Sequence, residues 1–147
     1  MFIFTYKSIF DDEFKAIVNP VNTRGVMGAG LALEFKKRYP ENFNIYRKAC
    51  LNKEMDIGKL CVVELDNKII INFPTKRDYR DKSDYEYIKS GMKELSIWLK
   101  KNKPENIAIP RLGCGLGGLE WYKVKRIICD CLSNIDVDIY ILGQYSG

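Results

Sequence analysis

A strand, a loop and a helix follow one another in the stretch Ala16-Ile17-Val18-Asn19-Pro20-Val21-Asn22-Thr23-Arg24-Gly25-Val26-Met27-Gly28-Ala29-Gly30. The apolar start predicts a short strand over residues 16–19, which we expect to stop at Pro20. A helix is expected from Gly30 to about Arg38, where Tyr39-Pro40 ends it. The glycines between the two elements let backbone N–H groups approach a ligand. Since a helix N-terminus favours anions, this stretch predicts an anion-binding loop.

A second glycine-rich loop has the same setting. It reads Pro110-Arg111-Leu112-Gly113-Cys114-Gly115-Leu116-Gly117-Gly118-Leu119-Glu120-Trp121. It follows a short apolar strand expected over residues 107–109, and it leads into a helix expected over residues 121–132. Two such loops at strand ends suggest a cleft for a diphosphate, which indicates a nucleotide-like ligand. The first loop matches neither GxGxxG nor a Walker loop, so a kinase or GTPase is disfavoured.

The rest of the chain continues the alternation of strands and helices. Ser83 and Glu86 stand at capping-box spacing and predict the start of the longest helix, which runs to about Lys101. A second short helix is expected over residues 41–50, and strands over residues 2–6, 60–65, 68–73 and 137–142, with Asp66-Asn67 as a hairpin signal. The pattern predicts a three-layer α/β/α sandwich with a mixed, mostly parallel sheet, in which ligands bind beyond the carboxyl ends of the strands.

Composition excludes several kinds of site. The 147 residues contain no histidine, which rules out Ser-His and Cys-His catalysis. The five cysteines are scattered without a CxxC pair, so we expect no metal, no cofactor and a reducing cytoplasm. No signal peptide or membrane span is visible, and a monomer is the default expectation. The net charge of +5 fits a solvated surface or attraction to a polyanion such as nucleic acid, and charge alone does not decide.

Both loops resemble the ligand loops of the macrodomains, which bind ADP-ribose. The long Gly-Val-Met-Gly-Ala-Gly-Leu-Ala form, residues 25–32, and the segment Phe73-Pro74-Thr75-Lys76 are similar to two groups within this superfamily. One is the DarG group, which removes ADP-ribose from thymidine in DNA. The other is the terminal ADP-ribose protein glycohydrolase. The resemblance covers essentially the whole chain, so residues 1–147 are expected to form a single macrodomain.

The resemblance also implies how the ligand lies. The first loop embraces the distal ribose and the diphosphate, the second loop closes over both, and Lys7-Ser8-Ile9-Phe10 lies near adenine. Asn19 and Asn22 carry amides that suit ribose hydroxyls, with turn formation as the alternative. The expected ADP-ribose contacts are Ile9, Asn19, Asn22, Thr23, Gly25, Val26, Met27, Gly28, Gly30, Leu112, Gly113, Cys114, Gly115, Leu116 and Gly117.

Lys76 is the expected catalytic residue, together with Asn22. The two similar groups use this lysine in glycosidic cleavage, where an amine can attack the anomeric carbon or pass a proton to the leaving group. The protein-directed glycohydrolase carries an acidic residue in its second loop at the position that Gly117 occupies here. The DarG group has Gly-Gly there, as this chain does at residues 117–118, which favours a DNA-directed enzyme.

The resemblance therefore implies an ADP-ribosyl glycohydrolase acting on ADP-ribosylated DNA, in the manner of an antitoxin. Single-stranded DNA is the expected partner, and Tyr79, Arg80, Lys82 and Tyr85 either hold the strand or form a polar approach to the long helix. Two alternatives stay open. One is a hydrolase of small ADP-ribose derivatives, such as ADP-ribose 1″-phosphate or O-acetyl-ADP-ribose. The other is a module that binds ADP-ribose without turnover.

Overall fold

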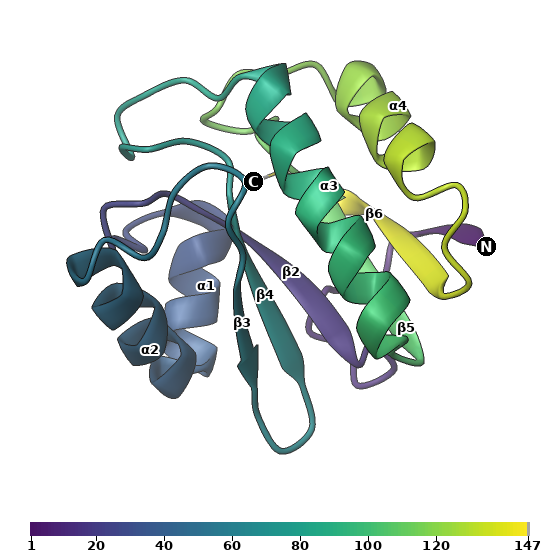
Figure 1. Cartoon of the computed structure of the whole chain (residues 1–147), viewed down its shortest axis with the longest axis horizontal. Helices are drawn as coiled ribbons and strands as arrows, with labels where there is room; N and C mark the ends of the chain where they lie inside the picture. Colours follow the sequence, from purple (N-terminus) through teal and green to yellow (C-terminus); the bar gives the residue numbers. More distant parts are fainter. Residues whose placement is uncertain (147) are drawn as a thin grey trace.

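The computed structural model describes the backbone of residues 1–146 and the side chains of residues 1–143. Strands and helices come in pairs along the first half of the chain and alternate from β4 (Ile69–Pro74) onward (Figure 1). In chain order they are β1 (Phe2–Thr5), β2 (Ala16–Val21), α1 (Gly30–Arg38), α2 (Pro40–Leu51), β3 (Cys61–Glu64), β4 (Ile69–Pro74), α3 (Tyr85–Asn102), β5 (Asn106–Arg111), α4 (Trp121–Cys131) and β6 (Asp138–Ser146).

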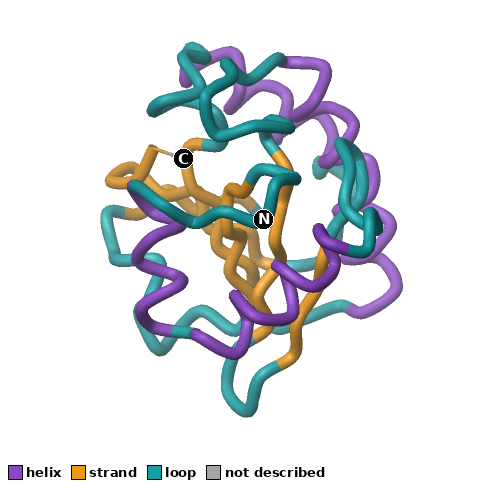
Figure 2. The backbone as a smooth tube through the Cα atoms, turned by 90° about the vertical axis from the view of Figure 1, so that its left-hand side faces the viewer, coloured by secondary structure: helices purple, strands orange, loops and turns teal. Residues whose placement is uncertain are grey.

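The six strands form one sheet in the order β1-β6-β5-β2-β4-β3. All neighbours are parallel except β3 and β4, which are antiparallel and joined by a tight hairpin in which Leu65 N donates to Lys68 O at 2.8 Å. Figure 2 shows the strands running through the middle with helices on both sides. The predicted sandwich with its mixed, mostly parallel sheet is confirmed.

Each face of the sheet has its own apolar core, because successive strand residues point to opposite faces. On β2, Val18 packs with α3 and α4, whereas Ile17 packs with α1 and α2. Four residues of α3 at helical spacing, Ile88, Met92, Leu95 and Leu99, are completely buried against the first face. Phe35 of α1 and Tyr46 of α2 fill the second. The predicted helices therefore cover both faces.

β2 extends through Pro20 to Val21, so the prediction that it stops at Pro20 was wrong. Val21 O accepts a hydrogen bond from Thr75 N at 2.9 Å, so the backbone groups of Val21 face β4 and those of Pro20 face β5. Within the described residues, β2 pairs with β5 at residues 16 and 17 alone. The missing N–H of Pro20 therefore costs no ladder bond. After residue 17, the edge of β2 that faces β5 is therefore not paired with β5. The first glycine loop begins at the end of this unpaired edge.

The N-terminal cap of α3 also differs from the prediction. Asp84 is the cap, and its carboxylate accepts a hydrogen bond from Glu86 N at 2.9 Å. Ser83 is buried instead, and its backbone N–H donates to Gly117 O at 3.0 Å. Asp takes the capping role one residue later because Ser83 is held by the second glycine loop. None of the described helices is long and apolar enough to cross a membrane.

Candidate active site

A cavity of about 290 Å³ opens at the carboxyl ends of β2 and β4, where the first glycine loop meets the N-terminus of α1. Its volume is close to the lower end of the range for small-ligand sites, about 300 Å³. The described residues that line it are Pro20, Val21, Asn22, Val26, Gly28, Ala29, Gly30, Leu31, Ala32, Thr75, Lys76, Tyr79 and Leu116.

The N-terminus of α1 forms one wall of this cavity. Ala29 is its N-cap and has an extended backbone, and no side chain caps the first turn. Gly28 and Gly30 are both exposed, and a Cβ placed on Gly30 would meet no atom within 4 Å. The first backbone N–H groups of a helix have no partner within the helix, and they carry a partial positive charge. This wall can therefore bind an anion such as a phosphate.

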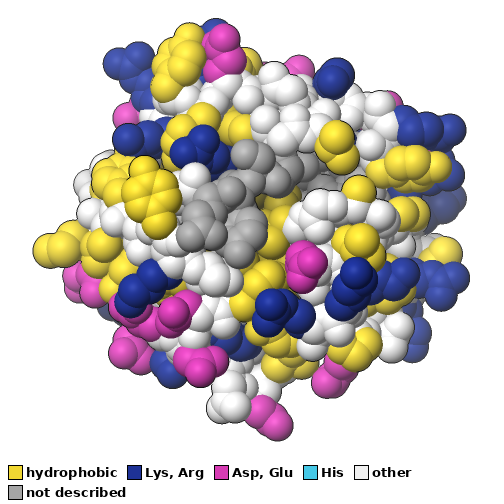
Figure 3. Space-filling model, turned by 180° about the vertical axis from the view of Figure 1, so that it is seen from behind, with side chains coloured by type: hydrophobic (Ala, Val, Ile, Leu, Met, Phe, Trp, Pro, Cys, Tyr) yellow, Lys and Arg dark blue, Asp and Glu magenta, His cyan; other side chains and the backbone are white. Residues whose placement is uncertain are grey.

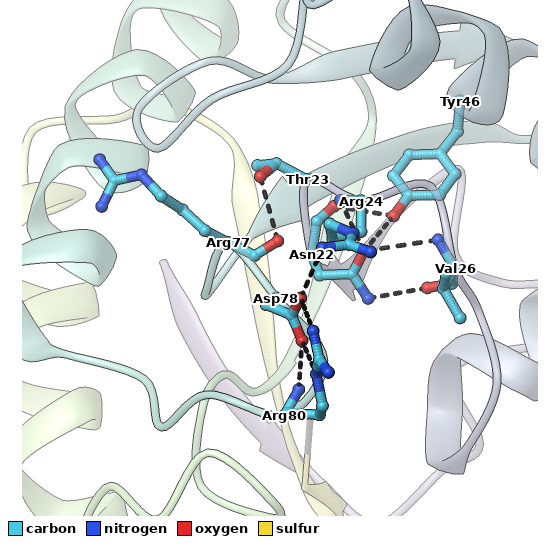
Figure 4. A network of polar contacts seen from close by, with 8 residues as sticks. All are labelled: Asn22, Thr23, Arg24, Val26, Tyr46, Arg77, Asp78 and Arg80. Carbon is cyan, nitrogen blue, oxygen red and sulfur yellow. Dashed lines mark hydrogen bonds and ion pairs between the residues drawn. The ribbon is translucent and has the colours of Figure 1, made fainter.

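Asn22 holds the first loop together (Figure 4). Its side-chain Nδ2 donates to Val26 O at 2.8 Å, and its Oδ1 accepts from Arg24 N at 3.0 Å. The Tyr46 hydroxyl lies 2.7 Å from Asn22 O and 3.0 Å from Asn22 Oδ1. Turn formation was the alternative that the sequence left open, and the structure has it. Asn22 also lines the cavity, and one of its two Nδ2 hydrogens is not used by the Val26 bond.

Hydrogen bonds and an ion pair connect the segment after β4 to the first loop. Arg77 O accepts from Thr23 N at 3.0 Å and from Thr23 Oγ1 at 3.1 Å. Asp78 forms an ion pair with Arg24 at 3.0 Å and a two-pronged contact with Arg80 at 2.9 and 3.0 Å (Figure 4). These bonds hold the pKa of the Asp78 carboxyl well below its usual range. Thr23 therefore links the first loop to the segment after β4. It is absent from the cavity lining, and its contact with ADP-ribose stays a prediction.

Lys76 is carried into the cavity wall by this segment, two residues after the end of β4. Its side chain is partly buried. Burial lowers the pKa of Lys76, and the nearby positive charge of Lys82 lowers it further. A lower pKa raises the fraction of neutral amine at a given pH, and the neutral amine is the nucleophilic form.

Asn19 and Met27, two expected ligand contacts, face the interior. Asn19 is completely buried and donates to Asn72 Oδ1 at 3.0 Å, while Asn72 and Asn42 exchange hydrogen bonds at 2.9 and 3.1 Å. Met27 is 1% exposed and belongs to the core under α1 and α2. The asparagine cluster ties β2, α2 and β4 together and fixes the start of the first loop. Neither side chain lines the cavity, and their contact with ADP-ribose stays a prediction.

Ile9 and Gly25 also lie outside the cavity lining. Ile9 is completely buried in the core beside Phe35, so its side chain has no surface on which a base could stack. Gly25 is buried against α2, where a Cβ would lie 3.4 Å from Cys50 Cβ.

The second loop folds on itself. Leu119 N donates to Gly113 O at 2.9 Å and Gly118 N donates to Gly115 O at 3.1 Å. Of the described residues of this loop, Leu116 alone lines the cavity. The other predicted contacts in this loop, Leu112, Gly113, Cys114, Gly115 and Gly117, do not line it.

Cys114 is partly buried and packs against the core formed with α3 and α4. Its thiol lies 3.4 Å from Leu112 O, and burial raises the pKa of this thiol to about 11. A thiol with so high a pKa is protonated near neutral pH and is a poor nucleophile.

Tyr79, which sequence analysis connected with DNA, lines the cavity and was missed as a cavity residue. Two other members of that group are engaged elsewhere: Arg80 contacts Asp78, and the Tyr85 hydroxyl accepts from Glu120 N at 3.0 Å. The signal for Tyr79 was its spacing of three residues from Lys76 in a segment that returns over the first loop. Figure 3 shows Lys and Arg side chains spread over the rear face rather than gathered in one patch, so charge does not mark a DNA face there.

Residues 18–128 match the family model of the Macro domain, and this range includes most of β2, both glycine loops and Lys76. The chain belongs to the macro domain family. This macro domain is 45% identical over 140 residues to a DNA ADP-ribosyl glycohydrolase of Mycobacterium tuberculosis, with 92% of this chain and 40% of that protein covered. It is 37% identical over 146 residues to a DNA ADP-ribosyl glycohydrolase of Thermus aquaticus, with 96% and 41% covered. The chain thus spans about two fifths of the length of these relatives.

Solved macro domains have the same fold. The macrodomain of Thermus aquaticus DarG superposes with a TM-score of 0.91 at 37% identity, with 97% of each chain covered. The macrodomain of Mycobacterium tuberculosis DarG gives 0.89 at 42% identity, with 95% and 97% covered. Thermosipho africanus DarTG in complex with ADP-ribose gives 0.82 at 32% identity, with 95% of this chain and 40% of that chain covered.

Proposed function

We propose that this macro domain is an ADP-ribosyl glycohydrolase that removes ADP-ribose from modified DNA, with Lys76 as its catalytic residue. The observation that carries the proposal is the position of Lys76. A lysine with a lowered pKa shares one cavity with Asn22 and with an uncapped helix N-terminus. An anion-binding wall beside an amine is the arrangement that cleavage of an ADP-ribosyl bond needs.

The cavity suggests how ADP-ribose binds. The diphosphate lies against the N-terminus of α1, where Gly28 and Gly30 leave the backbone N–H groups accessible. The distal ribose then lies between Asn22 and Lys76. The second Nδ2 hydrogen of Asn22 is suited to a ribose hydroxyl. Thermosipho africanus DarTG, which is similar in fold, has been solved in complex with ADP-ribose, and this supports the same ligand here.

Two chemical steps are open to Lys76. As a nucleophile, its neutral amine attacks the anomeric carbon, and a C–N bond forms while the bond to the leaving group breaks. The leaving group keeps the bonding electrons and takes the proton that the alkylated amine loses, and water then attacks the same carbon, which releases ADP-ribose and restores the amine. As a general acid, the ammonium form passes its proton to the leaving group while water attacks the anomeric carbon. Burial of the side chain lowers the cost of the neutral form and so favours the first step.

The similar proteins support DNA as the modified macromolecule. The relatives from Mycobacterium tuberculosis and Thermus aquaticus are DNA ADP-ribosyl glycohydrolases. A Thermosipho africanus relative, 30% identical over 152 residues, is a fusion of a DNA ADP-ribosyl transferase with a DNA ADP-ribosyl glycohydrolase. We therefore propose that the macro domain acts as a monomer on single-stranded DNA. It would reverse the action of such a transferase, as an antitoxin does, in the cytoplasm, with which the five free thiols are consistent.

The test is release of free ADP-ribose from a single-stranded oligonucleotide that carries ADP-ribose on thymidine. The native protein should release it, and Lys76→Ala should be slower by roughly 100-fold or more. Lys93→Ala, which removes an exposed lysine of α3 outside the cavity lining, is the matched control and should retain most of the activity. If the protein released ADP-ribose from ADP-ribose 1″-phosphate but not from the oligonucleotide, its substrates would be small ADP-ribose derivatives rather than DNA. Tight binding without any release would make the protein a reader.

A further inference from the structure

Tyr79 and Leu116 are the two most exposed of the large apolar side chains that line the cavity. Tyr79 is 50% exposed and Leu116 is 68% exposed, and both form part of the wall that holds Lys76. They come from different segments, the one after β4 and the second glycine loop. Exposed apolar surface that lines a cavity is typical of a binding site, because a ligand can bury it.

The backbone around Tyr79 is held in place before any ligand arrives. Asp78, the residue before it, accepts hydrogen bonds from the backbone N–H and the side chain of Arg80, the residue after it, each at 2.9 Å. The ion pair between Asp78 and Arg24 fixes this turn to the first loop (Figure 4). The Arg80 guanidinium also lies 5.3 Å from the centre of the Tyr79 ring. The ring is therefore presented by a preorganised turn, which reduces the entropy lost on binding.

We infer that Tyr79 and Leu116 form a subsite for a nucleobase, the group from which ADP-ribose is cleaved. This inference rests on the proposed function. Tyr79 lies three residues after Lys76 and shares its segment, so it belongs to the reacting end of the cavity. A planar base stacks on an aromatic ring whatever its sequence context, and an aliphatic side chain can cover part of the same base.

Other leaving groups fit this subsite less well. A phosphate beside Tyr79 would gain little from Arg80, because two of its guanidinium nitrogens are occupied by the Asp78 carboxylate at 2.9 and 3.0 Å. The carboxyl group of an acidic side chain gains little from the apolar surfaces of Tyr79 and Leu116, because burial of a polar group without a partner is costly. The chemistry of the wall thus favours an uncharged planar group.

The experiment measures affinity in the Lys76→Ala background, so that no ligand is consumed. The probes are free ADP-ribose and ADP-ribosyl-thymidine, which carries the base without DNA phosphates. Tyr79→Ala should weaken binding of ADP-ribosyl-thymidine by roughly 10- to 100-fold and that of ADP-ribose by less than about threefold. Tyr79→Phe keeps the ring and should restore most of the affinity for ADP-ribosyl-thymidine. Tyr122→Ala removes a 67% exposed tyrosine outside the cavity lining and is the matched control.

A second variant guards against misfolding. Leu116→Ala should also weaken ADP-ribosyl-thymidine selectively, with Ile97→Ala, which removes a 61% exposed side chain on α3, as its control. Equal effects of Tyr79→Ala on both probes, or no effect on either, would overturn the nucleobase subsite. If the proposed function were wrong, the native protein would release no ADP-ribose from the modified oligonucleotide. That result is distinct from the two affinity results that overturn the nucleobase subsite.

Discussion

The two glycine-rich loops have similar sequences and different tasks. In the first loop, Gly28 and Gly30 are exposed and line the cavity at the N-terminus of α1. In the second loop, Gly113 and Gly117 are buried, and a Cβ at Gly117 would lie 2.4 Å from Ser83 Oγ. Glycine therefore gives a ligand access to the backbone in one loop and allows close packing in the other.

The loops also differ in what holds them. The first loop is held by side-chain hydrogen bonds. The Asn22 side chain donates to Val26 O, and it accepts from Arg24 N and from the Tyr46 hydroxyl. The second loop depends on its own backbone hydrogen bonds and on the backbone bond from Ser83 to Gly117. A loop held by side chains can expose its backbone to a ligand, whereas a loop held by its backbone can offer a side chain, here Leu116.

The largest effect on stability is expected for Gly117→Ala. Its new Cβ would lie 2.4 Å from Ser83 Oγ and 2.6 Å from Gly113 O, closer than real Cβ contacts come. Overpacking of this kind costs about 1–3 kcal/mol of unfolding free energy, measurable by urea denaturation. The double variant Gly117→Ala/Ser83→Gly should recover part of the loss, because only the Gly113 O contact remains. A Gly117→Ala protein as stable as the native one would show that the second loop is not closely packed.

Asn22→Ala should come next. It removes the bond from Nδ2 to Val26 O and the acceptor of Arg24 N, so loop groups lose their partners at a cost of about 1–3 kcal/mol. Both the unfolding free energy and the ADP-ribose affinity should fall, because the loop is the binding wall. Tyr46→Phe removes one hydroxyl from the same network and should cost about 1 kcal/mol. Unchanged ADP-ribose affinity in Asn22→Ala would show that binding does not depend on the hydrogen bonds of the Asn22 side chain.

Gly28→Ala should affect binding rather than stability. The nearest atom to its Cβ would be Val26 Cγ1 at 3.5 Å, an ordinary contact, so the unfolding free energy should stay within about 0.5 kcal/mol. The added methyl group lies in the cavity wall and hinders approach of a phosphate to the backbone. Calorimetry should therefore show roughly tenfold weaker ADP-ribose binding. A stable Gly28→Ala protein with native affinity would contradict the assignment of the diphosphate to this wall.

The smallest effect is expected for Lys82→Met. Loss of this positive charge raises the pKa of Lys76, although burial, the larger cause of its lowered pKa, remains. If the neutral amine is the active form, the acid limb of the pH–rate profile moves to higher pH. If the ammonium form is active, the alkaline limb moves instead. A profile with neither limb moved would argue against titration of Lys76 in the reaction.

The fold was predictable because its signals are local. Each central strand is an apolar run, and α3 repeats Ile88, Met92, Leu95 and Leu99 at helical spacing. The errors were at boundaries decided by neighbours distant in sequence. Pro20 continues β2 because the free edge of β2 tolerates it, and Asp84 replaces Ser83 as cap because the second loop holds Ser83.

The candidate site was predictable in part. Asn22, Val26, Gly28, Gly30, Lys76 and Leu116 were singled out and line the cavity. Asn19 was not separable from Asn22 by sequence, because its burial depends on Asn72 and Asn42, which are distant in the chain. Tyr79 was not recognised as a cavity residue, because its position depends on the contact of Asp78 with Arg24.

The central claim is that the first loop and the N-terminus of α1 bind ADP-ribose, whereas Lys76 cleaves the bond to the leaving group. Two measurements on Lys76→Ala test this claim. Calorimetry gives its ADP-ribose affinity, and a discontinuous assay gives ADP-ribose release from the thymidine-modified oligonucleotide. The account predicts affinity within about threefold of the native protein and release slower by roughly 100-fold or more. A folded Lys76→Ala protein that releases ADP-ribose at the native rate would contradict it.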